Sequence, residues 1–254
     1  MCLILFALNQ HQDYPLIVIA NRDEYYARPT QSAHWWPDAP DIFAGRDLEA
    51  RGTWMGVNKN GRFAAVTNVR EPGAYGPPRL SRGQLTSDFL SGYESAEVYL
   101  QNIESSADDY AGFNLLVGDS GGLYFFSNRN PGIRCIPPGI YGVSNGLFDE
   151  SWPKLVSGKR ALSSALKTSV ENDSLMKILT DRVTAEDEQL PQTGVSVDIE
   201  RLLSSRFIHS GDYGTRACSI VKFNQRRQII FVEHNYDAAG RTEVNISEEF
   251  QISN

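Results

Sequence analysis

Residues 2–25 read CLILFALNQHQDYPLIVIANRDEY, which is two apolar runs joined by a short polar segment. Runs of Leu, Ile, Val and Phe of this length are typical of buried strands, and QHQDYP has the length of a hairpin loop. The stretch therefore predicts two paired antiparallel strands. Such pairing would place Cys2, at the start of the first strand, beside the charged end of the second strand, Asn21-Arg22-Asp23-Glu24.

The rest of the chain alternates between groups of predicted strands and groups of predicted helices. This order favours an α+β fold of antiparallel sheets with separate helical layers over a doubly wound parallel sheet. Ser151 is the predicted N-cap of the third helix, with Pro153 in its first turn. The further predicted strands are 52–58, 62–69, 113–119, 122–128, 140–145, 217–223 and 228–236, the predicted helices are 81–90, 95–105, 151–167, 174–183 and 198–207, and the predicted loops are 70–80 and 183–198.

Composition narrows the classes of function. A chain of 254 residues fits one large domain, expected to span residues 1–254. The formal net charge of −7 disfavours nucleic acid or an anionic membrane as the main partner. The three cysteines are far apart and form no CxxC, which favours a reducing compartment and a cytoplasmic location. LILFAL is too short to span a bilayer and follows no basic residue, so neither stable membrane insertion nor a secretory signal is expected.

The sequence does not support a metal site or a serine-protease site. The four histidines are scattered without ligand spacing, so no metal is expected. No P-loop or GxGxxG motif occurs, and no other cofactor is expected. The segment GDSGG at 118–122 resembles the region around the nucleophile of chymotrypsin-like proteases, but Leu123 follows it and it joins two predicted strands. We interpret it as a hairpin turn. Asn60-Gly61 predicts a second hairpin turn.

Cys2 is the strongest candidate for chemistry. A thiol with a pKa near 8.5 is only slightly ionised at neutral pH, and a neighbouring cation such as Arg22 would lower that pKa. Asp23 could orient an α-amine or a substrate. Removal of Met1 would free the α-amine of Cys2, which could then accept the thiol proton as an internal base. If Met1 stays, that amine is acylated and this mechanism is blocked.

Several motifs together resemble a known family. MCLILF, ANRDE, GTWMGVN, NGRFAAVTN, SRG, FNLL, YGVSNG with SWPK, and GTRACSIV occur in this order from Cys2 to about Glu233. The chain resembles the NRDE-motif family, also named for transport and Golgi organisation. That family is similar to cysteine N-terminal-nucleophile hydrolases such as penicillin V acylase and bile salt hydrolase. The resemblance implies a four-layer αββα sandwich of two antiparallel sheets.

The resemblance also implies roles for individual residues. Cys2 matches the nucleophile, and Arg22 and Asp23 resemble an Arg and an Asp that acylases space further apart, so Glu24 could share the role of Asp23. Asn145 resembles the oxyanion Asn, although an Asn there could also simply end a strand. Arg216 resembles a late Arg of the site, although it could also be a surface residue. The residues expected to line a substrate pocket are Asn21, Glu24, Asn68 and Trp54.

Two functions follow from these residues. The first is a cysteine N-terminal-nucleophile hydrolase that cleaves a non-peptide C–N amide or an acyl (thio)ester of a small molecule. The second is a non-catalytic carrier of an amphipathic anion such as haem or acyl-CoA, because the family has been linked to haem trafficking and lipid metabolism. No Cys-Pro haem motif occurs, since Ile136 follows Cys135. A carrier should tolerate loss of Cys2, whereas the hydrolase should not.

Overall fold

The computed structural model describes residues 2–73 and 80–253. Met1, on whose removal the proposed base depends, and residues 74–79 of the predicted loop 70–80 lie outside the described residues. The contacts divide the chain into two compact units, described in turn below. No helix in the described ranges is long and apolar enough to cross a membrane.

The first unit comprises residues 1–27, 70–73 and 138–249. Its six-stranded sheet has the order β10-β1-β2-β11-β12-β13, so strands from both ends of the chain lie side by side. Helices α3 and α4 pack on the β10, β1, β2 and β11 part of this sheet. Its elements are β1 Cys2–Leu8, β2 Leu16–Tyr25, β10 Gly139–Val143, α3 Pro153–Thr168, α4 Asn172–Leu179, the 3₁₀ turn Asp187–Gln189, α5 Val197–Leu203, β11 Tyr213–Phe223, β12 Gln228–Tyr236 and β13 Thr242–Gln251.

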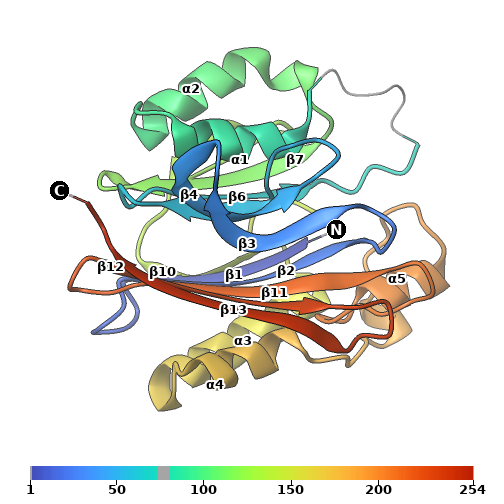
Figure 1. The fold of residues 1–254 in the computed structure, drawn as a ribbon. Coiled ribbons are helices and arrows are strands. Elements are labelled where there is room, and N and C mark those ends of the chain that lie inside the picture. Colours follow the sequence, from blue (N-terminus) through green and yellow to red (C-terminus); the bar gives the residue numbers. More distant parts are fainter. Residues whose placement is uncertain (1, 74–79, 254) are drawn as a thin grey trace. The chain divides into compact units, whose positions relative to one another are not determined.

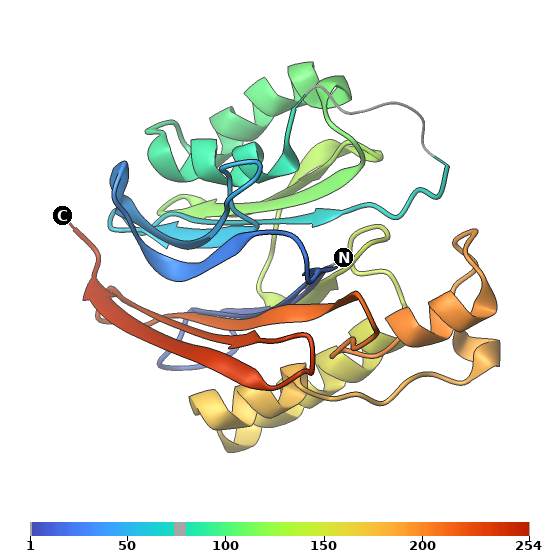
Figure 2. The ribbon, with the colours of Figure 1, turned by 45° about the vertical axis from the view of Figure 1, so that its right-hand side comes forward.

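The second unit comprises residues 28–69, 74–137 and 250–254. Its seven-stranded sheet runs in sequence order from β3 to β9, as expected of a meander of hairpins, and α1 and α2 cover one face of it (Figure 2). Its elements are β3 Thr30–Trp36, β4 Ala39–Asp47, β5 Met55–Asn58, β6 Phe63–Asn68, α1 Arg82–Ser91, α2 Ala96–Ser106, the 3₁₀ turn Ala107–Asp109, β7 Phe113–Asp119, β8 Gly122–Ser127 and β9 Asn130–Cys135.

Each unit has its own core between its sheet and its helices (Figure 1). In the first unit, alternate residues of β1 and β2, such as Leu3, Leu5 and Ile19, pack against Leu155 of α3 and Leu179 of α4. In a strand every second side chain points to the same face, so this core occupies one face of the sheet and leaves the alternate residues on the other. The α+β class of two antiparallel sheets with flanking helices is confirmed. The single-domain boundary 1–254 stays a prediction.

Several local predictions are also settled by the structure. The hairpin β1–β2 forms as expected, and the turns at Asn60-Gly61 and at 119–122 join β5 to β6 and β7 to β8. Ser151 is not the N-cap of α3, because the helix begins at Pro153 and Trp152 takes that position. The ring of a proline disfavours helical geometry in the preceding residue, so Trp152 must be extended and the helix cannot start before it.

Candidate functional site

The register of the first hairpin fixes the two faces of the candidate site. Cys2 lies directly opposite Arg22, and Leu3 lies opposite Asn21. Leu3 belongs to the core beneath the helices, so Leu3 and Asn21 point to the helical face and Cys2 and Arg22 point to the opposite face. The four residues of the Asn-Arg-Asp-Glu motif therefore divide between the two faces of the sheet.

The Cys2 side chain is partly buried and forms no disulfide. Removal from water raises the pKa of its thiol, and the charge of Asp23 adds to this rise. The positive charge of Arg22 and the backbone N–H of Asp23 act in the opposite direction and lower the thiol pKa. The thiol thus has positively and negatively charged neighbours. A nucleophilic role requires that the positive charges lower the thiol pKa by more than burial and Asp23 raise it.

Arg22 is a buried cation next to this thiol, with only 5% of the residue exposed. Its Nη2 lies 3.6 Å from Oε2 of Glu24, two residues further along the same face of β2. Glu24 is partly exposed, and its Oε1 accepts a hydrogen bond of 2.9 Å from the backbone N–H of Tyr25. The carboxylate of Glu24 therefore both compensates the charge of Arg22 and holds the end of the strand.

Asp23 is almost fully buried, and its surroundings come from β11. Its Oδ1 accepts a hydrogen bond of 2.7 Å from Oγ1 of Thr215, and that oxygen in turn accepts one of 2.9 Å from the backbone N–H of Ile208. Burial raises the pKa of the Asp23 carboxyl, whereas the charge of Lys154 and the Thr215 hydroxyl lower it. The Asp23 carboxyl is therefore held by a hydroxyl of β11 and attracted by a cation of α3.

Asn21 has a structural environment. Its Nδ2 donates hydrogen bonds of 2.9 Å to the carbonyl of Leu179 and 2.7 Å to the carbonyl of Arg206. Leu179 is the last residue of α4, whose final carbonyls lack partners within the helix. Asn21 thus joins the strand to the helical layer from the face opposite Cys2, and its predicted place in a substrate pocket stays a prediction.

Asn145 is held close to the first strand by its neighbour. Ser144 Oγ donates a hydrogen bond of 2.9 Å to the carbonyl of Cys2 and lies 3.3 Å from Oδ1 of Asn145. The backbone N–H of Arg70 donates to the carbonyl of Asn145 over 2.7 Å. Asn145 is 1% exposed and follows β10, the neighbour of β1 in the sheet. Pairing of β10 with β1 therefore brings Asn145 to the Cys2 end of the sheet.

Arg216 lies at an irregularity of β11. The pairing of β11 with β2 shifts by one residue between Thr215 and Ala217, so Arg216 is the extra residue of a β-bulge. Its Nη1 donates hydrogen bonds of 3.1 Å to the carbonyls of Tyr25 and Tyr26, just beyond the Asn-Arg-Asp-Glu motif. Bulges redirect a side chain, and this one directs the guanidinium to the end of β2.

The remaining two predicted residues belong to the second unit. Asn68 is the last residue of β6 and pairs with Phe113 of β7. Trp54 precedes β5, and its ring lies so close to Gly45 that any side chain at position 45 would collide with it. The roles predicted for Asn68 and Trp54 stay predictions, as do the catalytic roles of the residues above.

Lys154 is a charged residue that the sequence reasoning missed. It lies in the first turn of α3, is 2% exposed, and its Nζ has no hydrogen-bond partner among the described residues. Burial lowers the pKa of its ammonium group to about 8, against the attraction of Asp23. Lysine is rarely fully buried without a partner. The SWPK segment was visible as a motif, but sequence alone does not show that its lysine is inside.

A buried ion pair stands next to Lys154. Nη1 of Arg70 lies 2.6 Å from Oε2 of Glu200, and both side chains are almost fully buried. The guanidinium of Arg70 also lies 4.8 Å from the centre of the Trp152 ring. Arg70, Glu200, Trp152 and Lys154 are among the residues that line a cavity of about 10 Å³, which is large enough for one water molecule.

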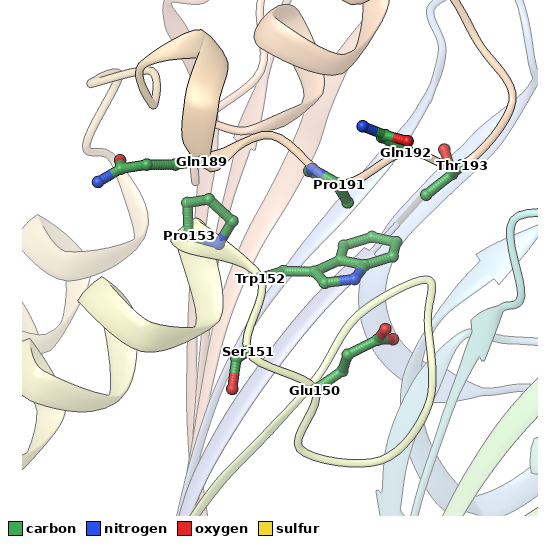
Figure 3. Close-up of a pocket in the computed structure, with 8 residues that line it drawn as sticks. All are labelled: Glu150, Ser151, Trp152, Pro153, Gln189, Pro191, Gln192 and Thr193. Carbon is green, nitrogen blue, oxygen red and sulfur yellow. The ribbon is translucent and has the colours of Figure 1, made fainter.

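Two larger hollows open beside the start of α3. One of about 340 Å³ contains the Trp152 ring between Pro191 and Glu150 (Figure 3). The other, of about 600 Å³, shares Ser151 and Pro153 with the first. None of the predicted site residues is among the described residues that line these hollows. Within the described part of the chain, no group of three or more His, Cys, Asp or Glu side chains is placed to hold a metal ion.

The chain is similar to one known protein family and to solved structures of the same fold. The family model described as Transport and Golgi organisation 2 matches residues 1–238. The Transport and Golgi organization 2 homolog of Mus musculus is 31% identical, over 92% of this chain and 93% of the relative, and the Drosophila melanogaster protein is 28% identical over 92% and 91%. Two variants of the conjugated bile acid hydrolase from Clostridium perfringens have TM-scores of 0.55 and 0.57, at 9% identity, over 99% and 98% of this chain and 92% of theirs. At this identity the structures establish a shared fold.

Proposed function

Because the chain belongs to the Transport and Golgi organisation 2 family and shares its fold with a bile acid hydrolase, we propose that it is a cysteine N-terminal-nucleophile hydrolase. The observation that carries the proposal is the cross-strand pair of Cys2 and Arg22, with Asp23 next in the chain. The first residue that removal of Met1 would expose thus carries a thiol opposite a buried cation, and a buried carboxyl follows that cation in the chain.

The proposed reaction starts with ionisation of the thiol. After removal of Met1, the α-amine of Cys2 accepts the thiol proton, and the sulfur attacks the carbonyl carbon of the substrate. The C–N bond of an amide, or the C–O or C–S bond of an ester, then breaks, and the proton passes to the leaving group. Water hydrolyses the resulting thioester, which releases the carboxylic acid and restores the thiol.

Arg22, Asp23 and Asn145 have separate tasks in this scheme. The charge of Arg22 favours the thiolate, and the carboxylate of Asp23 orients the α-amine. The side-chain amide of Asn145 donates to the oxyanion, a task supported by its attachment to the Cys2 carbonyl through Ser144. Arg216 keeps the end of β2 in place through the carbonyls of Tyr25 and Tyr26.

The proposed substrate is a small molecule with a non-peptide amide or an acyl (thio)ester bond. The hydrolase name of the bacterial protein with this fold supports hydrolysis. Arg22 and Arg216 supply positive charge at this end of the sheet, which suits a substrate with an anionic group. The chemistry at Cys2 is the same for amides and thioesters, so a panel of both is the appropriate assay.

The test combines mass spectrometry with turnover. Intact mass of the native protein reports whether Met1 is absent, and the same spectrum after mixing with substrate reports an acyl adduct. We expect loss of both adduct and turnover in Cys2→Ala, and retention of both in Cys135→Ala, which removes an exposed thiol. Equal turnover by Cys2→Ala would overturn the proposal and leave the carrier function as the alternative.

A further inference from the structure

Lys154 occupies a position that ordinary structural rules disfavour. It is 2% exposed and lies in the first turn of α3, where the aligned peptide dipoles repel a positive charge. Its Nζ is buried and has no hydrogen-bond partner in the described part of the chain. A lysine in such a place costs stability, so a role in the function of the molecule is a natural reason for its presence.

Four charged or ionisable groups among the described residues have the main influence on the amine of Lys154. They come from β1, β2, the segment after β6 and α5, and they are Cys2, Asp23, Arg70 and Glu200. Arg70 and Glu200 form an ion pair of 2.6 Å and largely cancel each other's charge. The attraction of Asp23 is the strongest influence on the amine after burial itself. Lys154 and Asp23 are therefore electrostatic partners across the junction between helix and sheet.

The direction of the side chains agrees with this pairing. Asp23 and Asn21 are two residues apart on β2, so they share the helical face of the sheet, to which α3 packs through β1 and β10. Gly158 of α3 is in close contact with Leu5 of β1, which brings the helix tightly onto the sheet. The backbone N–H of Asp23 also lowers the pKa of the Cys2 thiol, so the same residue influences Cys2 through its main chain.

We propose that Lys154 is a positioning residue of the cysteine site, and that its ammonium group holds the buried Asp23 carboxyl in the ionised form needed to orient the α-amine of Cys2. This inference rests on the proposed hydrolase function for its meaning. Its physical content is independent of turnover, because it concerns only the coupling between Lys154, Asp23 and Cys2. Below pH 8 the lysine is mainly protonated and supplies the charge, since its pKa is about 8.

The first test measures the ionisation of Asp23 directly. The ¹³Cγ resonance of Asp23, assigned by its loss in Asp23→Asn, is followed against pH in the parent protein, in Lys154→Met and in Lys167→Met. Lys167 lies on the exposed last turn of the same helix and is the matched control. We expect the midpoint for Asp23 to rise by about one pH unit in Lys154→Met and to stay constant in Lys167→Met. An unchanged midpoint in Lys154→Met would overturn the proposal.

The second test asks whether the effect reaches Cys2 through Asp23. The rate of Cys2 alkylation by iodoacetamide is measured against pH in a Cys135→Ser background, with Cys2→Ala as the blank. Lys154→Met should displace the profile by about half a pH unit, and the displacement should be much smaller when Asp23→Asn is also present, because only the direct interaction between Lys154 and Cys2 then remains. An equal displacement with and without Asp23→Asn would overturn action through Asp23. Both tests work on a protein without turnover, so failure of the hydrolase function is a separate result.

Discussion

Cys2 and Arg22 lie directly opposite each other on β1 and β2, and both side chains leave the sheet on the face opposite its helices. The relationship follows from the length of the hairpin loop, since a shift of one residue would turn the thiol toward the helices. The pairing of a nucleophile with a cation is thus set by the backbone register of the first hairpin.

Arg22 should set the reactivity of the Cys2 thiol. Its charge lowers the thiol pKa against the effect of burial, so Arg22→Met should raise that pKa further. We expect the pH profile of Cys2 alkylation to move about one unit to higher pH, and Arg22→Lys to move it less because the charge remains. Arg160→Met, at an exposed position of α3, is the control. A profile that is the same in Arg22→Met and Arg160→Met would contradict this account.

Asn21 should matter for stability and leave the thiol unaffected. Asn21→Leu removes the side-chain amide that donates two buried hydrogen bonds, and the carbonyls of Leu179 and Arg206 then lose this donor. We expect a loss of about 2–3 kcal/mol in the free energy of unfolding, measured with urea, and an unchanged alkylation profile of Cys2. Asn102→Ala, on the exposed side of α2, should change neither. A shifted profile in Asn21→Leu would instead place Asn21 within the site.

Arg22 and Asn21 differ in how much of their environment could be predicted from the sequence. The hairpin, and with it the neighbourhood of Cys2 and Arg22, could be predicted because alternation and loop length are local signals. Asn21 and Arg22 are both polar residues near the end of one strand, so the sequence does not distinguish them. The packing of α4 shows that Asn21 points to the helical face and Arg22 to the opposite face. Strand β13 carries few apolar residues and gave no local signal.

Lys154 illustrates a second limit of the sequence. A lysine in the first turn of a helix is normally solvated, so burial of its amine was not predictable from local pattern. Burial results from contacts with residues far away in the chain, such as Glu200 and Arg70, which line the same cavity. The bulge that redirects Arg216 is likewise a property of strand pairing that no single segment encodes.

Replacement of one member of the Arg70–Glu200 pair should lower the free energy of unfolding much more than replacement of both members. Arg70→Met leaves the buried carboxylate of Glu200 without its cation, and we expect a loss of about 3–5 kcal/mol in the free energy of unfolding. Arg70→Met combined with Glu200→Leu should recover most of that loss, because no charge then remains buried. Urea unfolding of the two single variants and the double variant measures the coupling. Additive losses would contradict a direct interaction.

Lys154→Met should stabilise the protein at neutral pH. The folded-state pKa of Lys154 is about 8, and the value in the unfolded chain is about 10.4. Between pH 8 and pH 10.4 the unfolded chain binds more protons at this lysine than the folded chain does. The free energy of unfolding of the parent protein therefore increases with pH across this window. At pH 7 its buried charge costs about 3 kcal/mol, including the attraction of Asp23.

We therefore expect Lys154→Met to raise the free energy of unfolding by up to about 3 kcal/mol at pH 7, with a gain that declines above pH 8 and disappears above about pH 10.4. Urea unfolding of the parent, Lys154→Met and Lys167→Met at several pH values measures the difference, and the exposed Lys167 should show none. A gain in stability together with a displaced Asp23 titration would mean that the charge of Lys154 acts on the site although it lowers the free energy of unfolding. A loss of stability at pH 7 that persists at high pH would instead show that its aliphatic stem holds the helix in place.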